Sequence, residues 1–172
     1  MKFAYSAVIC AILLTMLSFG GAQVTSAQTA KMSTYRVGAI VVEAPWSREA
    51  PGGVKRAVGY MRISNTGSKP DRLLSGTAAV TGRLEVHQSV VADGFTRMQA
   101  VTEGLEIRPG ETVELKPGAM HAMLMDLPRG PKAGETIKGT LVFEKAGIVE
   151  IEYVVGGLGS RVAPTMAGHH HH

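Results

Sequence analysis

Short apolar or alternating stretches, separated by frequent turn residues, make up most of this chain. From residue 36 onward these stretches are typical of β-strands, and the Gly, Pro, Asn and Asp residues between them are typical of turns. After residue 27, no stretch sustains helical periodicity over three turns. Many short strands at regular spacing predict an all-β domain, an antiparallel sandwich or barrel.

The last predicted strand shows the pattern best. Val149, Ile151 and Tyr153 alternate with Glu150 and Glu152, as expected for a strand with one buried face. The predicted strands span residues 37–43, 58–64, 71–75, 83–88, 97–100, 105–107, 112–115, 121–127, 136–143 and 149–155.

The two ends differ from this pattern. Residues 1–27 resemble a secretory signal peptide, with an early lysine, an apolar run and a small-residue cleavage site. The run is too short for a comfortable transmembrane helix, and an uncleaved membrane anchor is the alternative. We expect residues 28–35 to be a flexible lead-in, residues 36–156 to be one domain without a membrane span, and residues 157–172 to be a loose tail. The predicted location is outside the cytoplasm.

Composition excludes several classes of site. Cys10 is the only cysteine and lies in the predicted signal peptide. The exported chain would therefore have no disulfide, blue-copper centre, iron–sulfur cluster or cysteine nucleophile. Lys and Arg number 18 against 14 Asp and Glu, and these charges are scattered, which gives no indication of nucleic-acid binding. No nucleophile–base pair, paired-carboxylate motif or phosphate loop is evident, so we do not expect an enzyme.

Histidine and methionine carry the chemistry. Outside residues 169–172 the only histidines are His87 and His121. Met98 follows His87 after ten residues, and His121 follows Met98 after twenty-two, with Met123 two positions further on. Thioether sulfur is a soft ligand and imidazole a borderline one, and together they favour copper(I) over zinc, magnesium or calcium.

Strand geometry can bring these donors together. Residues two apart on a strand share a face, so His121 and Met123 should lie side by side. A hairpin at Asp93-Gly94 would fold Met98 back toward His87. The competing interpretation is that methionines on strands fill the core and that the histidines have no metal role. Under that interpretation the domain is a β-sandwich interaction module.

At this spacing the chain resembles the PCuAC family of periplasmic copper(I) chaperones. The family signature is a histidine, ten residues, a methionine, about twenty-one residues and then His-x-Met. The second gap is one residue longer here, which a loop near residues 101–104 could absorb. The matching segments are residues 44–48, 59–61, 65–67, 71–74, 85–87, 93–94, 98, 117–125, 141–144 and 147.

This resemblance implies a cupredoxin-like antiparallel Greek-key β-sandwich that binds one copper(I) per domain. The implied ligands are His87, Met98, His121 and Met123, and Met125 falls outside the signature and is expected to pack beside the site. The implied function is copper delivery, notably toward the copper centre of cytochrome c oxidase, with an exported copper donor or recipient as partner. Copper sequestration or resistance is the alternative. We interpret three further matches as structural: Trp46, Asn65 and Asp71.

The end of the chain leaves two interpretations open. Met166 and the four histidines at positions 169–172 could form a copper(II) site if they are native, or could be the remnant of a purification tag. A mobile imidazole-rich tail would suit copper(II) capture, since that ion prefers nitrogen and oxygen ligands.

Overall fold

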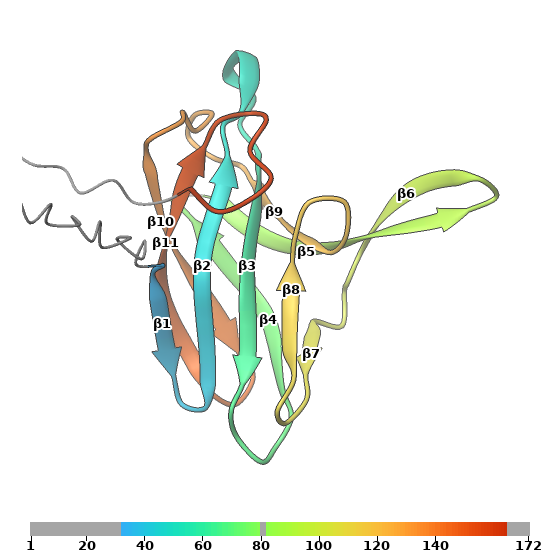
Figure 1. The fold of residues 1–172 in the computed structure, drawn as a ribbon, viewed down its shortest axis with the longest axis vertical. Coiled ribbons are helices and arrows are strands. Elements are labelled where there is room, and N and C mark those ends of the chain that lie inside the picture. Colours follow the sequence, from blue (N-terminus) through green and yellow to red (C-terminus); the bar gives the residue numbers. More distant parts are fainter. Residues whose placement is uncertain (1–31, 80–81, 165–172) are drawn as a thin grey trace, which may run out of the picture.

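The computed structural model describes residues 32–79 and 82–164 and is almost entirely β-structure (Figure 1). A single turn of 3-10 helix, η1 (Pro51–Gly53), interrupts the strands. The strands are β1 (Thr34–Val37), β2 (Ile40–Arg48), β3 (Ala57–Asn65), β4 (Asp71–Ala78), β5 (Gly82–Ala92), β6 (Phe95–Ala100), β7 (Leu105–Ile107), β8 (Thr112–Leu115), β9 (His121–Met125), β10 (Thr136–Phe143) and β11 (Gly147–Gly156). The prediction of an all-β fold is therefore confirmed.

Seven of these strands form a closed ring. Their order is β2, β11, β10, β4, β5, β9 and β3, and pairing of β2 with β3 closes the barrel. Strands distant in sequence lie next to each other, as in a Greek-key fold, and most pairs are antiparallel. The exception is the pair of β2 and β11, which is parallel over Trp46–Arg48 and Val154–Gly156. The remaining strands extend the ring: β1 beside β2, β8 beside β3, β7 beside β4 and β6 beside β5.

The predicted strands match the observed ones closely, and residues 105–107, 112–115 and 136–143 agree to the residue. The first prediction, 37–43, was wrong because it crosses a turn. Gly38 has a φ of 52° and reverses the chain between Val37 and Ile40, which pair across the β1–β2 hairpin. Strand β1 also begins at Thr34, inside the segment expected to be a lead-in.

Alternate residues fill the barrel. On β11, Val149, Ile151 and Tyr153 are buried, as their alternation with glutamates predicts. The Tyr153 hydroxyl has no hydrogen-bond partner among the described residues, and burial raises the pKa of this side chain. The interior also holds Leu84 and Val86 from β5 and, from β9, Ala122 and Leu124.

The three residues interpreted as structural have structural contacts. Trp46 is buried and its ring centroid lies 4.5 Å from that of Tyr60. The Asn65 amide donates to the Lys69 and Ile107 carbonyls. The buried Asp71 carboxylate accepts hydrogen bonds from three backbone N–H groups, at Arg72 (2.7 Å), Lys145 (2.9 Å) and Ala146 (2.9 Å). Asp71 therefore fixes the turn between β10 and β11 to the start of β4.

The described part of the C-terminal segment contacts the barrel. Residues 157–164 fold back on the end of β2, where Arg48 Nε donates to the Ser160 carbonyl at 2.7 Å and Leu158 N donates to Glu49 Oε1 at 2.9 Å. The predicted signal peptide and the histidines at positions 169–172 lie outside the described residues. Within residues 32–79 and 82–164, no helix has the length and apolar character needed to cross a membrane.

The Asp71 contacts lead to a stability prediction. We expect Asp71→Asn to lower the free energy of unfolding by about 1–3 kcal/mol, because an amide nitrogen would then face a buried backbone N–H donor. Urea unfolding measures this difference. The control is Asp93→Asn, the same substitution at an exposed turn, which should leave stability almost unchanged. Equal effects of the two substitutions would contradict the role assigned to Asp71.

Candidate metal centre

The candidate centre is built on the antiparallel pair of β5 and β9. His87 lies directly opposite His121, and Glu85 lies opposite Met123. Opposite residues in a ladder project from the same face, so these four side chains share one surface. The prediction that His121 and Met123 share a strand face is confirmed.

The core determines which face this is. Leu84 and Val86 on β5, and Ala122 and Leu124 on β9, are buried in the barrel. Because side chains alternate along a strand, the residues between them must point outward. The apolar packing of one set therefore places the two histidines and Met123 together on the outer surface.

His121 is 5% exposed although it lies on the outer face. Its Nδ1 lies 2.9 Å from the carbonyl oxygen of Ala119. A carbonyl only accepts hydrogen bonds, so Nδ1 must carry the ring proton, and Nε2 then holds the free lone pair. That Nε2 is buried and has no hydrogen-bond partner among the described residues. A buried acceptor without a partner is unfavourable. The same lone pair on Nε2 is the one through which His121 could bind a metal ion.

His87 lies beside this ring. The two imidazole centroids are 6.1 Å apart, and the rings are tilted by 37°. The Nε2 of His87 is 3.0 Å from Oε2 of Glu85, two residues earlier on the same face. The other oxygen of Glu85 forms an ion pair with Arg83, and the Arg83 Nε contacts Asp126 Oδ2 at 2.8 Å.

Met98 belongs to a hairpin that projects from the barrel. Strands β5 and β6 extend together as an arm (Figure 1), joined by Asp93 and Gly94 at positive φ angles of 53° and 77°. Both angles suit a two-residue type I′ turn, which Asp-Gly favours. Met98 pairs with Ser89, which lies two residues after His87 and therefore on the same face of β5. The Met98 side chain is 67% exposed. The hairpin therefore brings Met98 to the face of His87, as predicted, but on an exposed arm.

Two methionines follow His121 on this face at different distances from the histidines. Met123 is half-buried and lies one pair away, opposite Glu85. Met125 lies opposite Arg83, a further pair along the ladder. The register thus separates Met125 from the histidine pair.

The donor set distinguishes this centre from hard-ligand sites. Within the described parts of the chain, no group of three or more His, Cys, Asp or Glu side chains is placed to hold a metal ion. The side chains that share the face of His87 and His121 include the thioethers of Met98 and Met123, and sulfur with imidazole suits copper(I).

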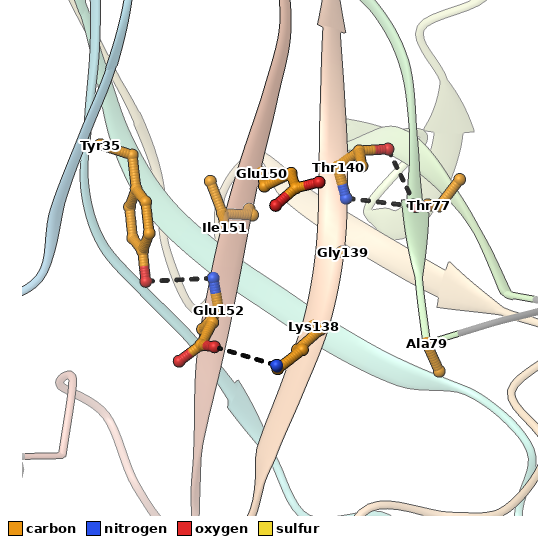
Figure 2. A pocket seen from close by; sticks show the side chains of 9 residues that line it. All are labelled: Tyr35, Thr77, Ala79, Lys138, Gly139, Thr140, Glu150, Ile151 and Glu152. Carbon is orange, nitrogen blue, oxygen red and sulfur yellow. Dashed lines mark hydrogen bonds and ion pairs between the residues drawn. The ribbon is translucent and has the colours of Figure 1, made fainter.

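A shallow groove of about 600 Å³ lies elsewhere, over β10, β11 and β4. Figure 2 shows contacts between several of its polar groups: Tyr35 Oη accepts a hydrogen bond from the Glu152 backbone N–H at 3.1 Å, and the Thr77 and Thr140 hydroxyls are hydrogen-bonded at 2.9 Å. Its lining includes none of the predicted metal ligands, and these contacts join neighbouring strands. We assign the groove a structural role.

Comparison with known proteins identifies the family. The sequence model of the family described as "Putative lipoprotein LpqE-like" matches residues 40–155. The chain belongs to this LpqE-like family, which is of the PCuAC type. The match covers most of the expected domain and both candidate strands. "Putative lipoprotein Lxx21020" of Leifsonia xyli subsp. xyli is 31% identical over 128 residues, which are 74% of this chain and 76% of the relative.

Solved structures of PCuAC type share the fold. The copper-bound PCuAC domain from PmoF2 is 32% identical, with a TM-score of 0.62, and the alignment covers 73% of this chain and 99% of that domain. The copper(I) form of DR1885 from Deinococcus radiodurans is 23% identical, with a TM-score of 0.52, over 78% of this chain and 85% of that protein. The expected cupredoxin-like fold is confirmed for this PCuAC-type chain.

The sequence analysis did not predict two of the groups that contact the histidine rings. They are the Glu85 carboxylate and the Ala119 carbonyl, each of which contacts one histidine ring. The position of Glu85 two residues before His87 on a strand was a usable signal, because such residues share a face. The carbonyl contact depends on the path of the turn before β9 and had no sequence signal.

The exposure of Met98 leads to a chemical prediction. In the metal-free chain treated with limiting peroxide, Met98 should form sulfoxide many-fold faster than the buried Met61, because oxidation requires access to sulfur. Met32, 56% exposed and outside the site, is the positive control. Peptide mass spectrometry follows each residue. Oxidation of Met61 at the rate of Met98 would argue against the placement of the hairpin arm.

Proposed function

We propose that this chain binds one copper(I) per domain through His87, Met98, His121 and Met123, and passes it to another protein as a non-enzymatic chaperone. The observation that carries the proposal is the buried His121 Nε2, which has no hydrogen-bond partner among the described residues and lies on the ring opposite His87. Support also comes from the PmoF2 domain, described as copper-bound, which this chain matches over 99% of that domain at 32% identity.

The donor chemistry fits monovalent copper. Methionine needs no deprotonation, and each histidine has one ring nitrogen left after its hydrogen bond. A neutral set of two imidazoles and two thioethers places no negative charge against the ion. It suits copper(II) less well, since that ion prefers tetragonal nitrogen and oxygen ligands.

The distribution of exposure supports transfer rather than permanent storage. His121 is buried, whereas Met98 is largely exposed on the hairpin arm. In this proposal a ligand of the partner replaces Met98 first, while the histidines keep hold of the ion. Copper then moves by exchange of one ligand at a time, without release into solution.

The proposed setting is the exported compartment. A relative at 31% identity is named as a lipoprotein, and residues 1–27 resemble a signal peptide. The proposed partner is an exported protein that donates or receives copper, and the family resemblance implies the copper centre of cytochrome c oxidase as a recipient. If residues 169–172 are native, we propose that they capture copper(II) separately from the inner site.

Removal of both thioethers tests the ligand set. Joint Met98→Leu and Met123→Leu should weaken copper(I) binding more than about 100-fold, since even loss of outer contacts to a metal ligand costs about 10- to 100-fold. Competition with a copper(I) chelator measures the affinity. The matched control is joint Met120→Leu and Met125→Leu, which also removes two thioethers near β9. Equal affinities of the two double variants would exclude these ligands, provided thermal unfolding shows that both fold.

A deletion strain tests delivery. If the chain supplies copper to cytochrome c oxidase, its loss should lower oxidase activity at low external copper, and added copper should restore it. The strain complemented with the Met98→Leu, Met123→Leu variant should behave like the deletion. Normal oxidase activity together with sensitivity to high copper would instead establish sequestration or resistance.

A further inference from the structure

The two imidazoles of the proposed site are held by partners of the same kind but through opposite ring nitrogens. His121 contacts the Ala119 carbonyl through Nδ1, and His87 contacts the Glu85 carboxylate through Nε2. Both partners are acceptors at neutral pH, so the contacting nitrogen must carry the proton in each ring. His121 is thus left with a free Nε2 lone pair and His87 with a free Nδ1 lone pair.

We propose that Glu85 is the positioning residue of this site: it holds His87 as the Nε2–H tautomer, so that His87 binds copper(I) through Nδ1 while His121 binds through Nε2. This inference rests on the proposed function and adds to it a residue outside the family signature. Glu85 acts through His87 and is not itself a ligand.

The register places the two thioethers on either side of His87. The two ring nitrogens of His87 flank Cε1 and point in different directions, so the nitrogen that contacts Glu85 leaves the other available to a second partner. Met98 lies on the far side of His87 from Glu85, because it pairs with Ser89, the next residue on this face. Met123 lies on the near side, because it pairs with Glu85.

Glu85 is itself fixed by its neighbours. Arg83 forms an ion pair with one oxygen of the carboxylate, and the other oxygen contacts His87. The Arg83 Nε in turn contacts Asp126, which directly follows β9. This chain of contacts links β5 to the end of β9 through the Glu85 carboxylate.

The charges and the spacing favour positioning over direct ligation. Arg83 offsets the charge of Glu85 beside a site that would hold a monovalent ion. Among the described residues, Glu85 and the two histidines do not form a three-ligand group. A hydrogen bond to the outer nitrogen of a metal-binding histidine fixes the ring and its tautomer, and this is the role left for the carboxylate.

Nitrogen NMR of the histidine rings reads the tautomers directly. In the metal-free chain at about pH 8, where histidine is ordinarily neutral, we expect Nε2–H for His87 and Nδ1–H for His121. After addition of one equivalent of copper(I), both protons should stay in place while the His87 Nδ1 and His121 Nε2 signals shift. Movement of the His87 proton to Nδ1 on loading would overturn the inference.

A series of variants tests the role of the acceptor. Glu85→Leu should weaken copper(I) binding about 10- to 100-fold, the usual cost of losing an outer contact, and should mix the His87 tautomers. Glu85→Gln keeps a carbonyl oxygen and should restore most of the affinity and the Nε2–H form. Glu114→Leu is the matched control, because Glu114 is exposed on β8 and also pairs with a basic residue two positions away, Lys116 at 2.8 Å.

The outcomes separate this inference from the proposed function. Parent-like affinity in Glu85→Leu, or equal losses in the Leu and Gln variants, would overturn the positioning role while copper(I) binding by the parent chain still stands. If the parent chain binds no copper(I), the proposed function fails, and this inference fails with it. Thermal unfolding of each variant shows whether a lost affinity reflects a lost fold.

Discussion

The pairing of β5 with β9 is the constraint on which the proposed site depends. Its register places His87 opposite His121, and its alternation sends Leu84, Val86, Ala122 and Leu124 into the core. A shift of one residue would exchange the two faces of a strand, burying the polar set and exposing the apolar one. The burial of the core therefore enforces the arrangement of the outer face, and the geometry of the histidine pair is maintained by side chains on the opposite face of the two strands.

The outer face of β5 and β9 contains a feature that lowers the stability of the fold. His121 is buried with an Nε2 that has no partner among the described residues, an arrangement that costs free energy when no ligand is bound. Such a cost persists only where the surrounding structure compensates for it. Here the closed barrel and the Asp71 carboxylate, with its three backbone hydrogen bonds, supply rigid support at other positions. A ligand that engages Nε2 relieves the cost, so binding and local stability are coupled.

Features with short-range causes could be predicted from the sequence. The Asp93-Gly94 turn and the alternation around His121 depend on neighbouring residues, and both occur as expected. Contacts between distant segments could not be predicted in the same way. The parallel pairing of β11 with β2 and the return of residues 157–164 onto Arg48 join positions about a hundred residues apart, and no local pattern encodes them. The Gly38 turn was missed because apolar residues continue on both sides of it.

The proposed site divides its ligands between a rigid and an exposed part, and this division has a physical consequence for transfer. The histidines belong to a ladder backed by the core, whereas Met98 lies on an arm whose β6 residues are all exposed. A ligand set that was rigid throughout would hold an ion tightly but would offer no position for a partner to attack. A ligand set that was exposed throughout would lack a preorganised geometry, and its affinity would be lowered by the entropic cost of ordering the ligands on binding.

Strand β5 joins the rigid part of the proposed site to the exposed part. This one element carries both the imidazole of His87 and the base of the arm. In the proposed function, the length of β5 beyond the barrel therefore serves transfer, because it places Met98 on an exposed arm while His87 stays in register with His121.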